Sequence, residues 1–139
     1  GKANVPQALL NKSDPLTPEE WSVLQSHSVR GEEMAKAVPF LADTAEYIRH
    51  HHEYWDGSGY PDGLEGKNIP LCSRILAVAS DFDAMVSERP YHARGMTREE
   101  ALEEIRRCSG VRYDPEVVEV FLQVVAKTAG IEDDAIRAA

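Results

Sequence analysis

The segment His51-His52-Glu53-Tyr54-Trp55-Asp56-Gly57-Ser58-Gly59-Tyr60-Pro61 is the most informative stretch of the chain. It places two adjacent imidazoles and two carboxylates beside a glycine-punctuated turn. Neutral imidazole nitrogen and carboxylate oxygen are ligands that divalent iron, manganese and zinc share. Two inward-facing neighbouring histidines could therefore serve two metal ions, and His27 is a candidate third ligand. An ordinary core helix does not need this density of ligands, so we place the functional site here.

The composition indicates a single acidic globular domain. The chain has 139 residues, 42% of them hydrophobic, which suffices for one domain, 1–139, with its own core. Its 15 basic and 24 acidic side chains give a net charge of −9, which argues against a general nucleic-acid or anionic-membrane surface. The two cysteines form no metal or disulfide pattern, which favours a reducing cytoplasm. No apolar run approaches a membrane span, so we expect no direct membrane contact.

Helical periodicity runs through almost the whole chain, and Gly and Pro fall between the periodic segments. Thr17, followed by Pro18 and by Glu20, is typical of an N-cap with a capping box. The first clear helix is predicted to begin there. His27 lies at the edge of the buried face of that helix, where its side chain could aim at the same centre as the two adjacent histidines.

The middle of the chain is predicted to form two helices joined by a loop. In the first, from 39 to about 55, His51 and His52 extend the apolar stripe at the C-terminal end and should point inward. Residues 56–69 are rich in glycine and predict a loop. Residues 71–88 are apolar on several faces, which predicts a central buried helix.

The last part of the chain repeats the helix-start signals. Thr97 with Glu100 forms a second capping box, and Asp114-Pro115 precedes a final amphipathic segment. The chain is therefore predicted to be an all-α bundle of about five to six helices, with an ordered glycine-rich loop after the helix that carries the histidine pair.

Each candidate residue also has an ordinary structural interpretation. A lone histidine such as His27 or His92 is more often a hydrogen-bonded core or surface residue than a ligand. The segment around Tyr60 could be a surface turn, or a loop whose tyrosine stacks on a base or hydrogen-bonds a phosphate. Arg89 could recognise a phosphate with its fork of donors, or simply lie at an exposed helix end. For 51–53 beside the glycine loop, the functional interpretation is favoured.

Taken together, these motifs resemble the signature of the HD-GYP family, and the resemblance covers nearly the whole chain. It rests on His51-His52-Glu53-x-x-Asp56-Gly57-x-Gly59-Tyr60-Pro61, Gly63-Leu64-x-Gly66-x-x-Ile69-Pro70-Leu71, Arg74-Ile75-Leu76-Ala77-Val78-Ala79, Phe82-Asp83-Ala84-Met85, Arg89-Pro90-Tyr91, Tyr113-Asp114-Pro115-x-Val117-Val118, and Leu16-Thr17-Pro18-Glu19-Glu20-Trp21 up to His27.

The resemblance implies an all-helical HD-superfamily phosphohydrolase that holds two or three divalent metals, iron or manganese. Such proteins hydrolyse cyclic di-GMP to linear pGpG or onward to GMP in bacterial signalling. Their metals bind the phosphodiester oxygens and activate a water molecule as hydroxide. The resemblance also implies an upstream sensory or receiver domain. The cysteine usage favours a cytoplasmic location, the net charge argues against a nucleic-acid partner, and a homodimer is a candidate assembly.

The resemblance assigns roles to individual residues. His27, His51 and His52 match the metal ligands, and Lys2 matches the catalytic lysine that follows the family's His-Asp pair. The substrate-binding positions that it implies are Gly59, Tyr60, Pro61, Asp83, Arg89 and His92.

Three departures from the family pattern bear on activity. The chain opens with Gly1-Lys2, which in the family come after the His-Asp pair, so we expect this sequence to lack that pair and the N-terminal helices. Ser80 stands where the family has a ligand aspartate, and a hydroxyl is a much poorer ligand. Asp81, about 100° further around the helix, is a candidate substitute, or else it faces solvent or pairs with Arg74. His92 stands where a lysine or arginine is common and is only partly charged near neutral pH.

Two main hypotheses follow from the sequence. The chain is the larger part of a metal-dependent cyclic di-GMP phosphodiesterase, or it is a degenerate module that keeps nucleotide or partner binding with little hydrolysis. A third, a phosphohydrolase of the same superfamily that acts on another nucleotide, is disfavoured by the intact Gly59-Tyr60-Pro61 loop.

Overall fold

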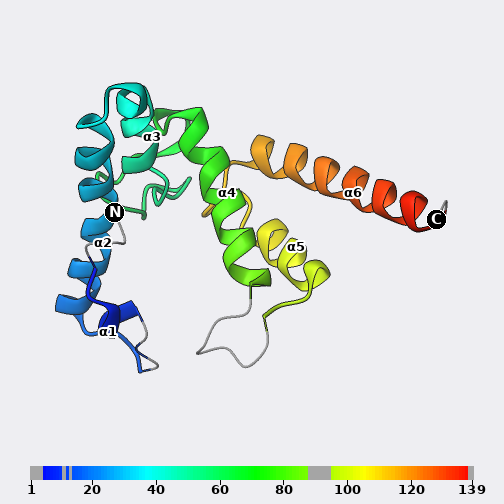
Figure 1. Ribbon diagram of the computed structural model, residues 1–139, viewed down its shortest axis with the longest axis horizontal. Helices are drawn as coiled ribbons and strands as arrows, with labels where there is room; N and C mark the ends of the chain where they lie inside the picture. The colour runs from blue at the N-terminus through cyan, green and yellow to red at the C-terminus, as the bar shows by residue number, and fades with distance from the viewer. Residues whose placement is uncertain (1–4, 11, 13, 88–94, 138–139) are drawn as a thin grey trace.

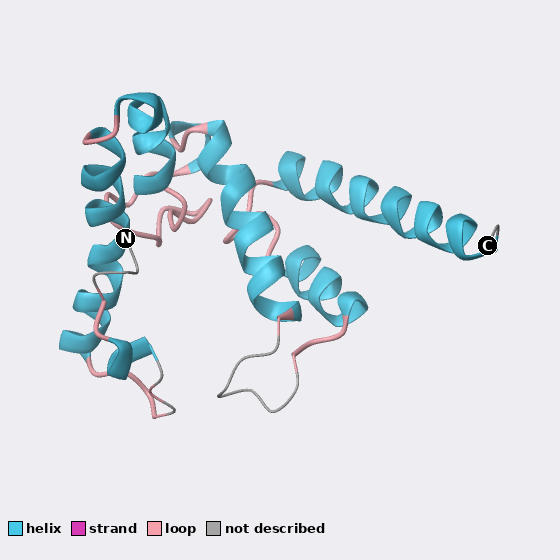
Figure 2. Ribbon diagram, in the orientation of Figure 1, coloured by secondary structure: helices cyan, strands magenta, loops and turns pink. Residues whose placement is uncertain are grey.

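The fold is entirely helical in the part of the chain that the computed structural model describes, which is residues 5–10, 12, 14–87 and 95–137. Within these residues there are six α-helices, two short 3-10 helices and no strand (Figure 2). In chain order the elements are α1 Gln7–Leu10, α2 Pro18–Lys36, η2 Pro39–Thr44, α3 Ala45–Arg49, η3 Gly66–Asn68, α4 Leu71–Val86, α5 Arg98–Arg107 and α6 Pro115–Arg137. The predicted all-α class is confirmed, and none of the described helices is both long and apolar enough to cross a membrane.

Two helices begin at the predicted capping boxes. The Thr17 hydroxyl accepts a hydrogen bond from the Glu20 N–H, and the Glu20 carboxylate accepts one from the Thr17 N–H at 2.7 Å. Thr97 and Glu100 form the same reciprocal pair at the start of α5. Because the first N–H groups of a helix lack partners within the helix, each box fixes where its helix begins.

The helix predicted from 39 to about 55 is wrong in its extent. The chain instead forms η2 and then the short α3, which ends at Arg49. The N–H of His50 still donates to the carbonyl oxygen of Glu46 at 3.2 Å, but the N–H of Glu53 donates to that of His50 at 3.1 Å, so a turn replaces the helix. The two adjacent histidines therefore lie in the turn after α3, where their rings are not bound to helical spacing.

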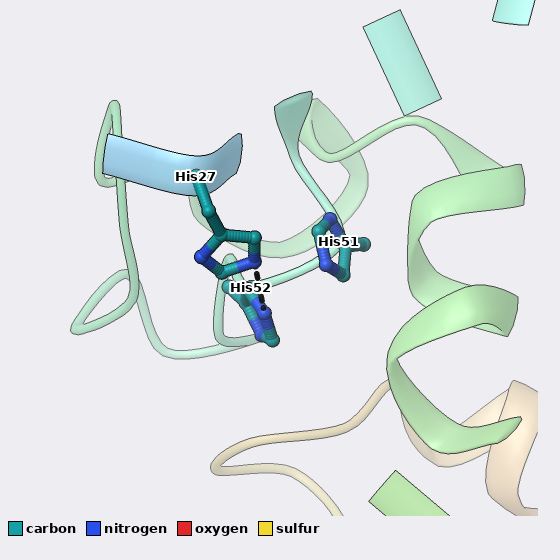
Figure 3. A group of neighbouring side chains, drawn as sticks. All are labelled: His27, His51 and His52. Carbon is teal, nitrogen blue, oxygen red and sulfur yellow. Dashed lines mark hydrogen bonds between the residues drawn. The ribbon is translucent and has the colours of Figure 1, made fainter. Parts of the chain in front are cut away.

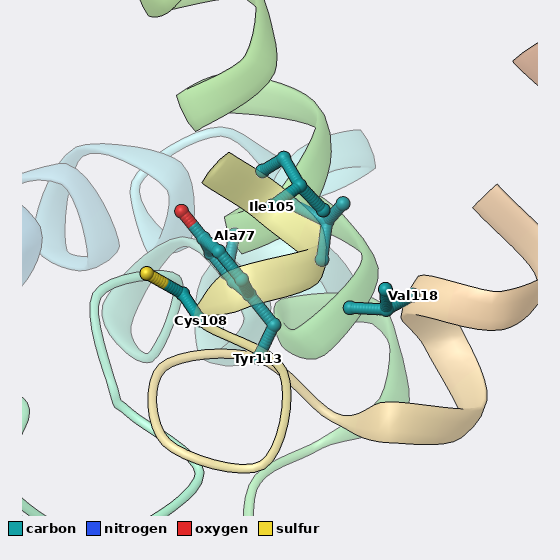
Figure 4. Close-up of a cluster of buried hydrophobic side chains, with 6 residues drawn as sticks. Ala77, Ile105, Cys108, Tyr113 and Val118 are labelled. Carbon is teal, nitrogen blue, oxygen red and sulfur yellow. The ribbon is translucent and has the colours of Figure 1, made fainter. Parts of the chain in front are cut away.

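The hydrophobic core lies where α4, α5 and the start of α6 meet (Figure 4). Its buried members are Ala77, Val78, Ile105, Cys108, Tyr113 and Val118. Phe82 and Phe121 pack beside this cluster with their rings edge to face, 5.3 Å between centroids. This core holds α4 in place next to the histidine-bearing turn.

The prediction that α4 is a central buried helix is wrong on one face. Leu71, Ile75 and Leu76 are 54%, 48% and 42% exposed. The reason is visible in Figure 1, where α6 contacts α4 near its own start and then projects away from the rest of the chain. On the other side, α2 and α3 pack together, and the glycine-rich segment lies between them and α4 (Figure 1).

Candidate metal centre

Three imidazoles from distant parts of the sequence converge at one point (Figure 3). His27 comes from the middle of α2, whereas His51 and His52 come from the turn after α3. One ring nitrogen from each histidine lies within 4.8 Å of the others, and Nε2 of His52 is 3.1 Å from Nε2 of His27. His27 is buried, at 4% exposure, so this cluster is built into the fold rather than spread over its surface.

The backbone fixes which nitrogen two of the rings present. Nδ1 of His27 donates to the carbonyl oxygen of Leu24 at 2.6 Å, and Nδ1 of His51 donates to that of Ile48 at 2.6 Å. A carbonyl oxygen can only accept, so Nδ1 carries the proton in both rings. Nε2 is then the basic nitrogen in each, which is the arrangement typical of metal-bound histidines.

These donors fit a divalent metal ion. Ligand nitrogens that lie about 2.0–2.1 Å from one metal are separated by roughly 3 Å, close to the His27 to His52 spacing of 3.1 Å. Imidazole suits iron and zinc, so the set does not by itself select a metal. The cluster of His27, His51 and His52 contains imidazoles and no carboxylate.

Ser80 and Asp81 on α4 do not belong to this group. Ser80 is exposed, and its hydroxyl donates to the carbonyl oxygen of Ala77 within α4 at 3.4 Å. The Asp81 carboxylate accepts from Arg112 at 2.8 Å and from the Tyr113 hydroxyl at 2.9 Å. The alternative in which Asp81 pairs with Arg74 is therefore wrong, because Arg74 bonds to Asp114 and to the backbone of Ile69.

A buried carboxylate anchors the glycine-rich loop. Glu53 is 2% exposed and accepts hydrogen bonds from the backbone N–H groups of Asp62, at 2.7 Å, and Leu64, at 3.0 Å. The sequence placed Glu53 among the candidate ligand types, but its two oxygens are committed to the loop. It therefore orients the segment that follows the two histidines.

Asp62, His50 and Arg49 tie the same loop to α3. Arg49 donates to both oxygens of Asp62, at 2.6 and 2.7 Å, and Nε2 of His50 lies 2.9 Å from one of them. The guanidinium of Arg49 holds the pKa of the Asp62 carboxyl down, at about 2. His50, Glu53 and Asp62 also have ligand atoms within 4.8 Å of one another. Arg49 already neutralises Asp62, and Glu53 accepts hydrogen bonds from the loop backbone, so we assign this group to holding the loop and not to binding a metal.

Gly59 lets the loop return against the histidine turn. The N–H of Tyr60 donates to the carbonyl oxygen of His52 at 3.1 Å, so the two backbone stretches touch. A Cβ atom at Gly59 would lie only 2.2 Å from the backbone nitrogen of Tyr54. Only glycine allows this approach, which stacks the Tyr60 ring on His52 with 5.0 Å between centroids. Burial raises the pKa of the Tyr60 phenol, so its hydroxyl keeps its proton.

A cavity of about 350 Å³ opens beside the imidazoles. Its walls combine leucines from the N-terminal part of the chain with aromatic, cationic and imidazole side chains and one carboxylate. They are Leu9, Leu10, Lys12, Leu16, Trp21, Leu24, His27, His52, Tyr54, Tyr60, Asp81 and Arg112. The sequence had singled out His27, His52, Tyr60 and Asp81 in this set, whereas Lys12, Tyr54 and Arg112 carried no motif that would have found them.

Other predicted site residues are not brought together by the described structure. Lys2, Arg89 and His92 lie outside the described residues. Asp83 is exposed on α4, and Pro61 follows Tyr60 in the loop. Their predicted substrate or catalytic roles stay predictions.

Comparison with known proteins places this geometry in a family. A sequence model of the HD domain matches residues 1–117. The chain belongs to the HD domain family. This HD domain is 46% identical over 126 residues to a Thermotoga maritima protein named cyclic di-GMP phosphodiesterase, covering 89% of this chain and 34% of that protein.

Two further relatives agree with that result. The HD domain is 40% identical over 125 residues to the cyclic di-GMP phosphodiesterase response regulator RpfG of Xanthomonas campestris pv. campestris, covering 88% of this chain and 33% of that protein. A crystal structure of a cyclic GMP-AMP specific phosphodiesterase of V. cholerae matches with a TM-score of 0.65 and 28% identity, over 90% of this chain and 32% of that one. The resemblance to the HD-GYP group is confirmed, and this chain spans about a third of the length of these relatives.

Proposed function

We propose that this HD domain is the hydrolytic part of a metal-dependent cyclic dinucleotide phosphodiesterase, with cyclic di-GMP as its first candidate substrate. The observation that carries the proposal is the convergence of Nε2 of His27 and His52, 3.1 Å apart, on the wall of a cavity, with a ring nitrogen of His51 within 4.8 Å of both residues' ligand nitrogens. The names of the relatives support hydrolysis over the alternative of a module retained only for binding.

In this proposal His27, His51 and His52 hold the metal, and iron or manganese is the expected choice. When bound, a divalent metal supplies a water of lowered pKa and stabilises charge on the phosphodiester oxygens. The carbonyl oxygens of Leu24 and Ile48 keep the His27 and His51 rings in the correct orientation and tautomer. Tyr60 can donate a hydrogen bond to the nucleotide because its hydroxyl keeps its proton.

The exposed hydroxyl at Ser80 leads to a testable prediction about metal content. We expect Ser80→Asp to raise both the metal bound per domain and the turnover of cyclic di-GMP, because a carboxylate offsets metal charge and a hydroxyl does not. Metal analysis and product chromatography on the two proteins check this. Ser87→Asp adds the same charge seven residues further along, at the C-cap of α4, and serves as the control. Full metal loading and rapid turnover with Ser80 intact would contradict the prediction.

The substrate class is tested by direct competition. Cyclic di-GMP, 3'3'-cGAMP and a linear dinucleotide are offered to the metal-loaded protein, and the products are separated by chromatography. The proposal expects cleavage of a cyclic dinucleotide; cleavage of none of them under conditions in which metal is bound would refute it.

We also propose the setting implied by the same group of proteins. The domain would act in the cytoplasm behind a sensory or receiver domain, which the response-regulator name of one relative supports. A homodimer is the proposed assembly, and sedimentation of the whole protein would test it.

A further inference from the structure

Arg112 stands out because no sequence motif pointed to it, yet it lines the cavity beside His27, His52 and Tyr60. It follows α5 by a few residues, in the short connection that leads to α6. Its backbone carbonyl oxygen accepts a hydrogen bond from the N–H of Trp55 at 3.1 Å. The backbone of Arg112 is therefore anchored to the segment that carries the histidine pair, although Arg112 and His52 are 60 residues apart in the sequence.

Three neighbours hold the guanidinium in one place. Its Nη2 donates to the Asp81 carboxylate at 2.8 Å. Its Cζ lies 4.8 Å from the ring centroid of Tyr54 and 5.5 Å from that of Tyr113. Tyr113 itself donates to the same oxygen of Asp81 at 2.9 Å. A long side chain that is clamped in this way loses little further entropy when it binds a ligand.

The clamp leaves donors of Arg112 for a ligand. A guanidinium has five N–H donors; in Arg112 one from Nη2 bonds to Asp81 and Nε is buried without a partner, which leaves Nη1 and the second hydrogen of Nη2. The side chain is 33% exposed, and the residue lines the cavity. The other cation on this wall, Lys12, is already 2.6 Å from the Glu20 carboxylate. Both cations are thus paired with a carboxylate, but only Arg112 offers a planar group whose remaining donors are held in fixed directions, whereas the ammonium of Lys12 is a point charge on a flexible stem.

From this geometry we propose that Arg112 binds a phosphate group of the nucleotide in the cavity, and that Asp81 is the positioning residue that aims it. The inference rests on the proposed function for the identity of the nucleotide. The planar fork of a guanidinium matches two phosphate oxygens at once, which a lysine in the same place would not do. A cyclic dinucleotide has two phosphates, so one can be held by Arg112 while the metal-bound site acts on the other.

The proposal gives Asp81 a role different from that of a substitute metal ligand. In the described structure its carboxylate is committed to Arg112 and Tyr113 and is outside the imidazole group. Replacing it by asparagine should therefore loosen Arg112 and raise KM without lowering metal content. A loss of bound metal in Asp81→Asn would instead assign the carboxylate to the metal and overturn the positioning role.

The test compares Arg112→Gln, Arg112→Lys and Arg107→Gln in the whole, metal-loaded protein. Arg107 is 70% exposed at the end of α5, pairs with Glu104 and does not line the cavity, so its variant removes the same charge elsewhere. For Arg112→Gln we expect the KM for cyclic di-GMP to rise about tenfold to a hundredfold, the range for one lost hydrogen bond to a charged group. Arg112→Lys should recover part of that loss, and Arg107→Gln should match the wild type.

A second measurement separates binding from folding and from the proposed function. Calorimetric titration with inorganic phosphate should show weaker binding in Arg112→Gln than in the wild type, at unchanged metal content and far-ultraviolet circular dichroism. Unchanged KM and phosphate affinity in that variant would overturn the role of Arg112 and leave the hydrolytic function standing. Phosphate binding that depends on Arg112 in a protein that cleaves no cyclic dinucleotide would refute the function but support the site. A wild type that binds neither phosphate nor cyclic di-GMP would overturn both.

Discussion

Replacing His27 by alanine is expected to remove most of the bound metal and to lower cyclic dinucleotide hydrolysis by at least about a hundredfold. Loss of a residue that merely orients a metal ligand already costs roughly ten- to a hundredfold, so loss of a ligand should cost at least the upper end of that range. His27 is buried and its Nε2 is 3.1 Å from that of His52, so the substitution removes a ligand nitrogen from the inside of the cluster. Metal analysis and initial rates on the purified variant measure both effects.

His50→Gln is the matched control for that experiment. It removes an imidazole from the residue next to the pair, but glutamine can still donate to Asp62, which now lies 2.9 Å from Nε2 of His50. Metal content should therefore stay close to that of the wild type. If His27→Ala keeps its metal, or if His50→Gln loses as much, the assignment of the imidazole cluster as the metal centre is wrong.

Gly59→Ala is expected to destabilise the domain by about 3 kcal/mol, the upper part of the usual range for overpacking, and to reduce metal binding with it. The added Cβ would lie 2.2 Å from the Tyr54 nitrogen and 2.6 Å from the carbonyl oxygen of His52. Both neighbours are backbone atoms, so relief requires the loop to leave the histidine turn. Chemical denaturation and metal titration would detect the change.

Gly66→Ala provides the comparison for Gly59→Ala in the same loop. Gly66 has φ +58°, and no atom lies within 4 Å of an added Cβ. Alanine there would meet no steric clash with its neighbours, and the only cost is that of its left-handed backbone conformation. We expect it to cost about 1 kcal/mol and to leave metal affinity unchanged. Equal losses in the two variants would mean that backbone conformation, and not the close approach at Gly59, holds the loop in place.

Local signals in the sequence predicted the helical class and several helix starts well. Thr17 and Thr97 each precede a glutamate by three residues, and both form the reciprocal hydrogen bonds of a capping box. Asp114 likewise accepts from the N–H of Glu116 at the start of α6. These features depend on residues a few positions apart, so a sequence without structural information contains them in full.

Features that depend on side chains meeting across the fold were not predictable in the same way. Periodicity predicted a helix from 39 to about 55, whereas α3 ends at Arg49, because a stripe of apolar residues does not reveal where the backbone changes from helical bonding to a turn. The ion pair of Asp81 with Arg112 joins residues 31 positions apart, and neither lies in a motif that requires the other. The exposed face of α4 follows from the direction in which α6 leaves, which amphipathic patterning does not determine.

The central proposal is that His27, His51 and His52 would hold a divalent metal on which hydrolysis of a cyclic dinucleotide depends. The most direct measurement strips the protein of metal with a chelator, restores manganese or ferrous iron in steps, and records bound metal and cyclic di-GMP hydrolysis at each step, with His27→Ala alongside. We expect hydrolysis to vanish on stripping and to rise in proportion to the metal bound, while the variant stays flat. Hydrolysis that persists in the stripped protein, or metal that returns in full without cleavage, would contradict the claim.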